Sequence, residues 1–497
     1  MRLTDLLRAS GYTPSASAAK KNPEIRGITA DSRQVGPGYL FAALPGARLD
    51  GRAYLGQAAR KGAAAVLAPH DTDFKTFPLG EGSAEVVVLL DDNPRRRLAL
   101  LAAGFYGRQP EKVAAVTGTN GKTSVASFTR QLWRALGQEA ASLGTLGATP
   151  PLPDAPKSLT TPDPVDLHKY LAEVAETGIE HLAMEASSHG LAQYRLDGVK
   201  VSAAAFTNLT RDHLDYHGTM EAYRAAKLRL FSDLVVPGGA AVLNADAPDY
   251  PRFEEAAAAR GLTIVSYGRV GTELRLLAQA PTAKGQEIEI EALGRRHRVP
   301  LALFGAFQSA NVLAALGLVI ATGSDAGEAV AALETLTGVP GRLELVATTP
   351  KGGAVYVDYA HTPDALETVL VAVRPHVEGK LWVVFGCGGD RDAGKRPLMG
   401  AACARHADRV VVTDDNPRSE DPATIRRAAL EGAPGAQEIG DRGTAIATAV
   451  AALGPGDALV IAGKGHETGQ IVGDRVLPFD DAAVARTAAQ TPGGTPR

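Results

Sequence analysis

The sequence predicts an α/β protein of three domains, with a central P-loop parallel sheet that has a small antiparallel part, and a C-terminal Rossmann-like doubly wound domain. The chain has 497 residues, and at roughly 100–200 residues per domain this length suggests two to four domains. Short apolar runs alternate with helical patterns, which is typical of parallel sheets covered by helices. Several runs end in Gly-rich or polar turns, where doubly wound folds bind their ligands.

The first domain is predicted to span residues 1–108. The runs "GYLFAALPG" and "AAAVLAP" are separated by Gly and Pro and are typical of strands. The stretch "EVVVLLDDNPRRRLALLAAGFYG" predicts a strand, a turn at Asn93-Pro94, and a helix that ends near Gly104–Gly107. The following "RQPEK" is a plausible linker.

The second domain is predicted to span residues 109–338. The runs "VAAVTG", "IEHLAMEAS", "VSAAAFTNLT" and "GAAVLNAD" predict strands buried on both faces. From about Thr263 to Pro300 the pattern alternates instead, as in "QEIEIEAL", which predicts antiparallel strands. The run "GAFQSANVLAALGLVIATG" returns to a helix. The third domain, residues 339–497, repeats strands followed by polar turns, as in "KLWVVFGCGGD" and "DALVIAGKGHE".

The composition indicates a globular protein in a reducing compartment. Hydrophobic residues make up 45% of the chain and the formal net charge is −3, so a strongly basic nucleic-acid-binding protein is not indicated. Two cysteines, Cys387 and Cys403, cannot form a disulfide framework. The N-terminal residues do not resemble a signal peptide, and no run reaches the roughly 18 apolar residues of a membrane span. We expect a cytoplasmic monomer with neither a nucleic-acid partner nor a membrane span.

The strongest local motif is "VAAVTGTNGKTSVASF", Val113 to Phe128. Gly118 and Gly121 let backbone N–H groups approach phosphate oxygens, and the helix near Lys122 presents its positive end to the same anion. Lys122 can reach the outer phosphates, and the Thr123 hydroxyl can ligate Mg²⁺. The Walker pattern is incomplete because Val116 stands where its first Gly would be. The loop predicts nucleotide binding, but kinases, motors, GTPases and ligases all share such loops.

Two further polar stretches follow strands of the second domain. Glu185 in "MEASSHGLAQYRLDG" is suited to Mg²⁺ at a strand end, although the same loop is equally compatible with a capped helix start. His213 lies in "NLTRDHLDYHG" among carboxylates, which favours a metal or phosphate contact over a structural role. Lys227, on the following helix, would by itself be a solvated lysine.

Two arginine-bearing loops follow strands of the third domain. The loop "GCGGDRDAGKRP" carries Arg391, and "TDDNPRSEDP" carries Arg418 after the turn-forming Asn416-Pro417. Arginines form bidentate pairs with carboxylates or phosphates. Turn chemistry explains Asn-Pro but not two arginines on adjacent strand ends, so these loops indicate an anion-binding site.

The order of ten motifs resembles the Mur ligase family over nearly the whole chain. These motifs are TGTNGKT, TTPD, MEASSHGL, NLTRDHLDYHG, YRAAKLRLF, GRLE, DYAHTPDALE, GCGGDRDAGKRP, DDNPR and GKGHE. The resemblance implies a UDP-sugar-binding first domain, an ATP-binding second domain and an amino-acid-binding third domain. It also implies ATP-dependent amide formation through an acyl phosphate, with a diamino acid added to the D-glutamate side chain of UDP-N-acetylmuramoyl-L-alanyl-D-glutamate in peptidoglycan precursor synthesis.

The resemblance also implies site residues. ATP would be held by Gly118, Thr119, Asn120, Gly121, Lys122, Thr123, Ser124, Asn311, Arg342 and His361. The catalytic residues would be Lys122, Lys227, Glu185 and His213, and Mg²⁺ would bind Thr123, Glu185, His213 and Lys227 as a carbamate. The UDP-peptide would contact Ser32, Ala47, Arg48, Leu49, Thr160, Thr161, Ser187, Gln193 and Arg195. Family members often have a more polar stretch at 47–49, so the individual uridine contacts are the weakest of these expectations.

The added amino acid is expected to be meso-2,6-diaminopimelate. The stretch "DNPR", Asp415 to Arg418, resembles the signature of family members that add this amino acid, and the resemblance implies an amino-acid site of Arg391, Asp415, Asn416, Pro417, Arg418, Gly463 and Glu467. Arg418 can pair with the second carboxylate of diaminopimelate, whereas L-lysine or L-ornithine would leave the arginine unpaired. Those two amino acids remain alternatives, as do folylpolyglutamate synthase and a non-catalytic nucleotide-binding regulator.

Overall fold

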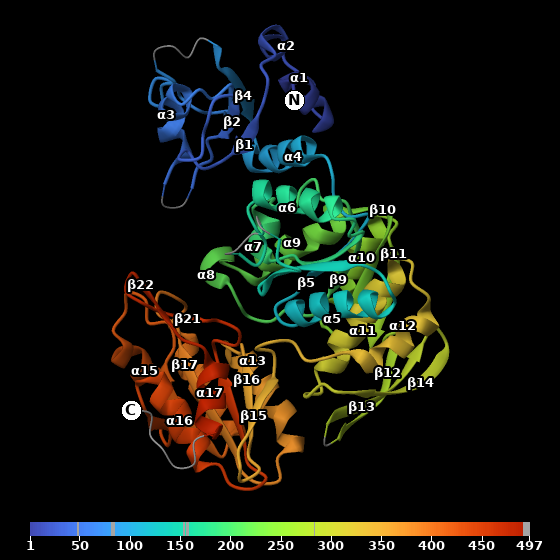
Figure 1. Ribbon diagram of the computed structural model, residues 1–497, viewed down its shortest axis with the longest axis vertical. Coiled ribbons are helices and arrows are strands. Elements are labelled where there is room, and N and C mark those ends of the chain that lie inside the picture. Colours follow the sequence, from blue (N-terminus) through green and yellow to red (C-terminus); the bar gives the residue numbers. More distant parts are fainter. Residues whose placement is uncertain (47–48, 81–84, 153–154, 156–158, 283, 491–497) are drawn as a thin grey trace.

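The computed structural model describes residues 1–46, 49–80, 85–152, 155, 159–282 and 284–490. Three α/β domains follow one another along the longest axis of the molecule (Figure 1). This arrangement confirms the predicted three-domain α/β fold. Ala47 and Arg48, which were expected to contact a UDP-sugar, lie outside the described residues.

The N-terminal domain is a small parallel sheet with the strand order β1-β2-β3-β4. Its strands are β1 (Gly27–Thr29), β2 (Tyr39–Ala42), β3 (Ala65–Pro69) and β4 (Val87–Asp91). Its helices are α1 (Leu3–Ala9), α2 (Ala16–Lys21), α3 (Leu55–Arg60) and α4 (Pro94–Tyr106), with a 3-10 turn at Gly51–Tyr54. The Asn93 side chain caps the start of α4, and Gly107 follows its end with a φ of 70°, so the turn and helix read from the sequence are confirmed. Strand β1, only three residues long, was not predicted.

The central domain contains a ten-stranded sheet with the order β14-β13-β12-β11-β10-β9-β5-β8-β6-β7. Its strands are β5 (Lys112–Thr117), β6 (Ala140–Gly144), β7 (Gly147–Thr149), β8 (His181–Glu185), β9 (Val201–Phe206), β10 (Val235–Asn244), β11 (Thr263–Gly268), β12 (Leu274–Thr282), β13 (Gly285–Ala292) and β14 (Arg295–Leu301). The P-loop strand β5 lies between β8 and β9, parallel to both. The loops after these three strands therefore leave the sheet side by side at one edge.

Helices cover both faces of the central sheet (Figure 1). The face that α5 covers has a core shared with α11 and α12, and the opposite face packs against α6, α9 and α10. The bounds are α5 (Lys122–Ala135), α6 (Pro164–Glu176), α7 (Ser188–Ala192), α8 (Leu214–His217), α9 (Met220–Arg229), α10 (Tyr250–Ala259), α11 (Gln308–Ala321) and α12 (Ala326–Ala332). A sheet buried on both faces explains why its strands are continuous apolar runs.

The antiparallel part of the sheet begins later than the sequence predicted. Strands β12, β13 and β14 pair antiparallel with one another, as expected. Strand β11, however, is parallel to both β10 and β12. Its Tyr267 is buried against the α11 face of the core, so β11 belongs to the helix-covered part of the sheet.

The C-terminal domain contains a six-stranded sheet with the order β15-β16-β20-β17-β18-β19. Its strands are β15 (Glu344–Thr348), β16 (Ala354–Asp358), β17 (Leu381–Cys387), β18 (Arg409–Asp414), β19 (Gln437–Glu438) and β20 (Ala458–Ala462). Its helices are α13 (Pro363–Val373), α14 (Lys395–His406), α15 (Pro422–Leu430), α16 (Arg442–Ala452) and α17 (Asp481–Gln490), and a separate hairpin joins β21 (Gly469–Val472) to β22 (Arg475–Pro478). Apart from the edge strand β15, the strands are parallel. Helices lie on both faces, which is the predicted doubly wound arrangement.

Candidate active site

Two neighbouring cavities lie where the central and C-terminal domains meet. The larger has a volume of about 710 Å³ and is lined by the P-loop, the loops after β8 and β9, and residues after β16. The smaller has a volume of about 390 Å³ and is lined by the loops after β17, β18 and β20. Asp212, His213, His361 and Arg391 line both cavities. The predicted phosphate and amino-acid sites are therefore adjacent.

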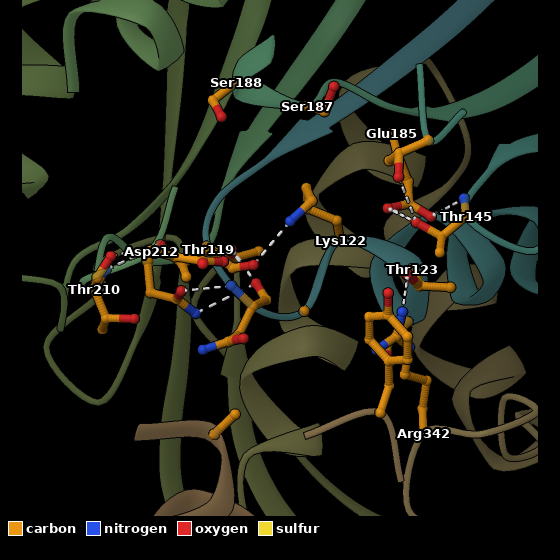
Figure 2. A pocket seen from close by; sticks show the side chains of 18 of the residues that line it. Thr119, Lys122, Thr123, Thr145, Glu185, Ser187, Ser188, Thr210, Asp212 and Arg342 are labelled. Carbon is orange, nitrogen blue, oxygen red and sulfur yellow. Dashed lines mark hydrogen bonds between the residues drawn. The ribbon is translucent and has the colours of Figure 1, made fainter. Parts of the chain in front are cut away.

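The P-loop wraps the amino end of α5. The φ angles of Gly118 and Gly121 are 155° and 87°, and a Cβ at Gly121 would lie only 2.5 Å from Asn311 Oδ1. Lys122 folds back over the loop, where its Nζ donates to Thr119 O at 2.8 Å (Figure 2) and to Gly118 O at 2.9 Å. Gly121, Lys122 and Thr123 line the larger cavity at the start of α5, where a helix N-terminus favours an anion.

The loop after β9 fixes the P-loop, a role that the sequence did not reveal. Thr207 Oγ1 donates to Asn120 O at 2.6 Å, and Asn208 Oδ1 accepts from the backbone N–H of Asn120 at 2.9 Å. Thr119 Oγ1 accepts from the backbone N–H of Thr210 at 3.0 Å. The only available signal was that these residues directly follow a strand in the polar stretch "TNLT".

Two lysine ammonium groups converge on one backbone carbonyl. Lys227 is 1% exposed, and its Nζ donates to Gly118 O at 2.7 Å, the same oxygen that Lys122 contacts. Burial, and then the charge of Lys122, hold the pKa of Lys227 well below its usual range. Desolvation likewise lowers the pKa of Lys122. Lys227 is thus no solvated lysine, and burial makes its protonated form less favourable than it would be in water.

Glu185 ends β8 beside the cavity and is 1% exposed. Its carboxylate accepts from the backbone N–H of Thr145 at 2.8 Å and from Thr145 Oγ1 at 3.1 Å (Figure 2). Gly144 is required for this approach because a Cβ there would lie 2.2 Å from Glu185 Oε1. Thr145, which follows the unpredicted strand β6, was also missed from the sequence.

Three histidines pack together beside the phosphate loop. The ring centroids of His189 and His213 lie 4.9 Å apart, and those of His189 and His217 lie 5.6 Å apart. Burial lowers the pKa of each of the three to about 4. His213 Nε2 lies 3.4 Å from Asp212 Oδ2. The imidazoles are therefore neutral at neutral pH, which is the form that can ligate a metal.

Arg342 connects the two domains at the cavity. Its Nη2 donates to Thr123 Oγ1 at 2.9 Å, and its guanidinium carbon lies 4.4 Å from the centroid of the Tyr359 ring (Figure 2). Asn120 Nδ2 also bridges the domains, donating to Asp364 Oδ2 at 3.3 Å. His361 lines both cavities, and its Nδ1 lies 2.8 Å from Tyr359 O. Ser124 and Asn311 line the larger cavity as well.

The residues expected on the peptide path form one hydrogen-bonded group. Thr161 Oγ1 donates to Glu185 O at 2.9 Å and accepts from the backbone N–H of Ser187 at 3.0 Å. Arg195 donates to Thr161 O at 2.8 Å and to Gln193 Oε1 at 2.7 Å. Thr160, Thr161, Ser187 and Arg195 line the larger cavity, whereas Gln193 contacts Arg195 and is not among the described lining residues. Two residues expected at the sugar, Ser32 and Leu49, lie in the N-terminal domain, away from both cavities.

The smaller cavity gathers most of the residues expected to bind the amino acid. Arg391, Asp415, Asn416, Arg418, Gly463 and Glu467 line it, and Pro417 is not among the residues described there. Arg418 has a φ of 52° and its Nη1 donates to Gly389 O at 2.7 Å. Asn416 Nδ2 donates to Glu467 Oε2 at 3.1 Å. Lys464 lies beneath these side chains with no exposed surface, and it was not singled out from the sequence although "GKGHE" contains it.

The oxygen donors around the phosphate loop suit Mg²⁺ bound together with a phosphate. Mg²⁺ in nucleotide sites commonly uses one or two carboxylates plus phosphate oxygens and water. Thr123 and Glu185 line one cavity with the P-loop and supply a hydroxyl and a carboxylate. Among the residues that the structure describes, no group of three or more His, Cys, Asp or Glu side chains is arranged as a protein-only metal site. These residues therefore fit a Mg²⁺ ion that takes its other ligands from phosphate oxygens and water.

Sequence patterns of one family match all three domains. The pattern described as "Mur ligase family, catalytic domain" matches residues 24–106, "Mur ligase middle domain" matches 116–319, and "Mur ligase, glutamate ligase domain" matches 341–465. A protein of Caulobacter vibrioides named UDP-N-acetylmuramoyl-L-alanyl-D-glutamate--2,6-diaminopimelate ligase is 57% identical over 471 residues, which cover 93% of this chain and 95% of that protein.

Solved structures give the same result at the level of fold. A structure of a UDP-N-acetylmuramoyl-L-alanyl-D-glutamate--2,6-diaminopimelate ligase superposes with a TM-score of 0.66 and 34% identity, covering 94% of each chain. A Mycobacterium tuberculosis folylpolyglutamate synthase complexed with ADP has a TM-score of 0.60 and 21% identity, and covers 74% of this chain and 91% of its own. The second likeness concerns the fold alone. In the part of the chain that the structure describes, no helix is long and apolar enough to cross a membrane.

Proposed function

Since the chain belongs to the Mur ligase family and is therefore an ATP-dependent ligase that forms amide bonds, we propose that it joins meso-2,6-diaminopimelate to the D-glutamate side-chain carboxylate of UDP-N-acetylmuramoyl-L-alanyl-D-glutamate. The observation that carries the proposal is that the phosphate-loop cavity and the arginine-bearing cavity share lining residues. An activated carboxylate in one cavity is thereby within reach of an amine in the other. The product is a peptidoglycan precursor, needed for cell-wall growth, cell shape and division.

Each domain has its own part in this proposal. Residues 1–108 bind the UDP-sugar, residues 109–338 bind ATP, and residues 339–497 bind the diamino acid. We propose that the enzyme works as a monomer. Synthesis of a UDP-linked precursor at the expense of ATP is chemistry of the cytoplasm, which is where we propose that the enzyme acts.

The nucleotide is held by the P-loop and by residues that face it. The backbone of residues 118–124 and the Lys122 ammonium bind the phosphates, and Asn311 and His361 contact the nucleoside. Arg342 approaches the phosphates from the C-terminal domain, and its contact with Thr123 Oγ1 supports this placement. These groups stabilise the charge that develops on the transferring phosphoryl group.

Mg²⁺ is proposed to bind Thr123 and Glu185 at one position, and His213 with Lys227 as a carbamate at a second. When bound, the metal ions would neutralise charge on the phosphate oxygens. Carbamylation requires a neutral amine, because only the free lone pair attacks CO₂. The depressed pKa of Lys227, caused by burial and by the neighbouring Lys122, supports that state. Intact-protein mass spectrometry in bicarbonate should detect the added mass of one CO₂ in the wild type and not in Lys227→Met.

The chemistry proceeds in two steps on this chain. A glutamyl carboxylate oxygen attacks the γ-phosphorus of ATP, ADP leaves, and an acyl phosphate forms. The amine nitrogen then attacks the acyl carbon, a proton leaves the nitrogen, and inorganic phosphate departs with one oxygen of the former carboxylate. Thr160, Thr161, Ser187, Gln193 and Arg195 hold the peptide and pyrophosphate of the substrate, and Ser32 and Leu49 contact the UDP-sugar. The cationic loop stabilises the negative charge in both steps.

Diaminopimelate is favoured over L-lysine and L-ornithine by the two arginines of the smaller cavity. Arg391 and Arg418 line it and are suited to the distal carboxylate, which lysine and ornithine lack. Glu467 is suited to the distal ammonium. The 57% identity to a protein named as a 2,6-diaminopimelate ligase supports the same amino acid.

One experiment tests the substrate and the mechanism together. The protein is incubated with ATP, Mg²⁺, the UDP-dipeptide and equal amounts of the three amino acids, and the products are identified by mass. We expect the diaminopimelate product, with ¹⁸O from a labelled glutamyl carboxylate recovered in the phosphate. Products with only lysine or ornithine would refute the amino-acid assignment, and unlabelled phosphate would refute the acyl phosphate. ATP binding with no amide product would support a regulator instead.

A further inference from the structure

Lys464 lies directly beneath the smaller cavity, two residues after the end of β20. Its side chain has no exposed surface, and Lys464 is not among the described residues that line the cavity. Its Nζ lies 3.0 Å from Asn416 Oδ1, 3.3 Å from Glu467 Oε2 and 3.5 Å from Asp415 Oδ1. An ammonium has three N–H donors, so these three oxygens use its whole capacity. Lys464 therefore does not bind a ligand itself.

The three partners of Lys464 are all residues that line the cavity. Asn416 Oδ1 also accepts from the backbone N–H of Ile471 at 2.9 Å. Two donors, Lys464 Nζ and this N–H, therefore fix the orientation of the Asn416 amide, with its oxygen toward them. The amide nitrogen of Asn416 consequently faces Glu467, to which it donates at 3.1 Å. Lys464 and Asn416 thus hold the Glu467 carboxylate in one orientation, beside the cavity and ready to accept an ammonium.

Lys464 also contributes to the charge balance of the cavity. The lining carries six carboxylates, those of Asp212, Asp215, Asp364, Asp392, Asp415 and Glu467, and four cationic side chains, those of Arg211, Arg391, Lys395 and Arg418. Lys464 adds a positive charge from below, within 3.5 Å of the carboxylates of Asp415 and Glu467. At neutral pH meso-diaminopimelate has two carboxylates and two ammonium groups and no net charge, whereas L-lysine has a net charge of about +1. A buried cation disfavours the more cationic ligand.

We propose that Lys464 is a positioning and specificity-determining residue of the amino-acid site, which orients Glu467 and Asn416 and discriminates against monocarboxylic diamino acids. This inference rests on the proposed function because it takes diaminopimelate as the ligand of the smaller cavity. Removal of the ammonium leaves the buried carboxylate of Asp415 and the partly exposed carboxylate of Glu467 short of one partner each, so the site binds diaminopimelate less tightly and accepts L-lysine more readily.

The test compares Lys464→Met with the wild type in steady-state kinetics with diaminopimelate and with L-lysine. We expect the KM for diaminopimelate to rise about 10- to 100-fold. The preference for diaminopimelate, as a ratio of kcat/KM values, should fall by at least about tenfold, with the KM for ATP within about twofold. Loss of folded protein alone would lower both kcat values equally and leave the ratio unchanged. Lys380→Met removes an exposed lysine from the same domain and should change neither quantity.

Lys464→Arg keeps the positive charge and is the second variant, which remains informative if the methionine variant does not fold. It should keep the preference within about threefold of the wild type, even with a raised KM. A soluble Lys464→Met with wild-type KM and preference refutes the role of Lys464, and so does a soluble Lys464→Arg that has lost the preference. A wild type that does not use diaminopimelate refutes the proposed function itself, so the two failures are distinguishable.

Discussion

The phosphate loop and the amino-acid cavity both contain buried lysines, but their partners differ. Lys122 and Lys227 donate to backbone carbonyl oxygens of Gly118 and Thr119, which are neutral acceptors. Lys464 contacts the carboxylates of Asp415 and Glu467. The lysines of the phosphate loop thus contact uncharged acceptors, whereas the ammonium of Lys464 is paired with carboxylates inside the protein.

This difference corresponds to the charge of the two proposed ligands. A nucleotide phosphate chain is a polyanion, and a site with excess positive charge gains most when the anion arrives. A diamino dicarboxylic acid is a zwitterion. In a site of paired charges, each charged side chain can give up its partner in the protein and bind a ligand group that has the same charge as that partner. Burial lowers the pKa of both Lys122 and Lys227, so a bound phosphate would favour the protonated form of each lysine.

The largest expected effect comes from removing a cation of the phosphate loop. Lys122→Met should lower kcat by about 10³-fold, because a preorganised charged donor at a phosphoryl group contributes roughly 10²–10³ or more to the rate. Release of phosphate in the presence of all three substrates measures it. Lys112→Met is the control and should keep wild-type activity, because Lys112 is a partly exposed residue at the start of β5, the strand that leads into the P-loop. An effect of less than tenfold would contradict the excess-charge interpretation of this loop.

The next largest effect is a loss of stability, expected when the buried ion pair of Arg442 and Asp481 in the C-terminal domain is broken. Arg442 and Asp481 both have fully buried side chains and are joined by two 2.7 Å hydrogen bonds. Arg442 also donates to Asp414 O and Ala462 O, at the ends of β18 and β20. Asp481→Asn leaves a buried cation without its partner and should lower the free energy of unfolding of the C-terminal domain by about 3–5 kcal/mol.

Urea denaturation followed by tryptophan fluorescence measures this loss, since Trp382 lies in β17 of the same domain. Lys122 lies in the central domain and donates to neutral backbone oxygens, so Lys122→Met should leave the unfolding transition of the C-terminal domain unchanged. A destabilisation by Asp481→Asn of under 1 kcal/mol would show that the buried pair is not required beneath the cavity.

A third prediction contrasts this charged pair with a histidine that the central domain buries as a neutral group. His168 is 3% exposed, its Nε2 lies 3.0 Å from Asp197 O, and burial lowers its pKa from 6.5 to about 4. Between these values the unfolded chain binds the proton and the folded chain does not, so stability falls as the pH falls from about 6.5 toward about 4. The loss approaches about 3 kcal/mol at pH 4.

His168→Gln removes the titrating group and keeps an N–H donor. The variant should therefore lose less stability than the wild type between pH 6.5 and 4.5, as measured by urea denaturation at each pH. His70→Gln, whose parent side chain lies in the N-terminal domain, serves as the matched control. Parallel pH profiles for His168→Gln and the wild type would contradict burial of a neutral imidazole at this position.

The smallest effect is expected for an exposed ion pair of α17, the helix that also contains Asp481. Arg486 in α17 contacts Glu344 in β15 at 3.1 Å, and the two side chains are 49% and 27% exposed. Arg486→Ala should change the free energy of unfolding by no more than about 1 kcal/mol, because exposed ion pairs contribute little. Its comparison with Asp481→Asn by the same denaturation assay isolates the effect of burial within one helix. A loss as large as that of Asp481→Asn would mean that burial is not what distinguishes the two pairs.

Local sequence patterns were sufficient to locate the candidate functional residues that lie directly after a buried strand. The sequence alone determined the P-loop between β5 and α5, the position of Glu185 at the end of β8, and the arginine loops after β17 and β18. In each case a buried strand and the turn that follows it are contiguous, so apolar periodicity and turn chemistry locate them. The alternation of polar and apolar residues also indicated the antiparallel strands β12 to β14. It did not reveal that β11 is parallel to its neighbours, because the direction of a strand relative to its neighbours depends on the whole sheet and not on the residues of that strand.

The tertiary structure decided which of these loops meet. Only the strand orders β9-β5-β8-β6 and β16-β20-β17-β18 bring Thr145, Thr207 and Lys464 to their sites from positions far apart in the chain. The burial of Lys227 and the pairing of Arg442 with Asp481 likewise depend on helices packed from other segments. The physical reason is that the sequence records the chemistry of each residue, whereas solvation and charge partners are properties of neighbours that the chain acquires only when it folds.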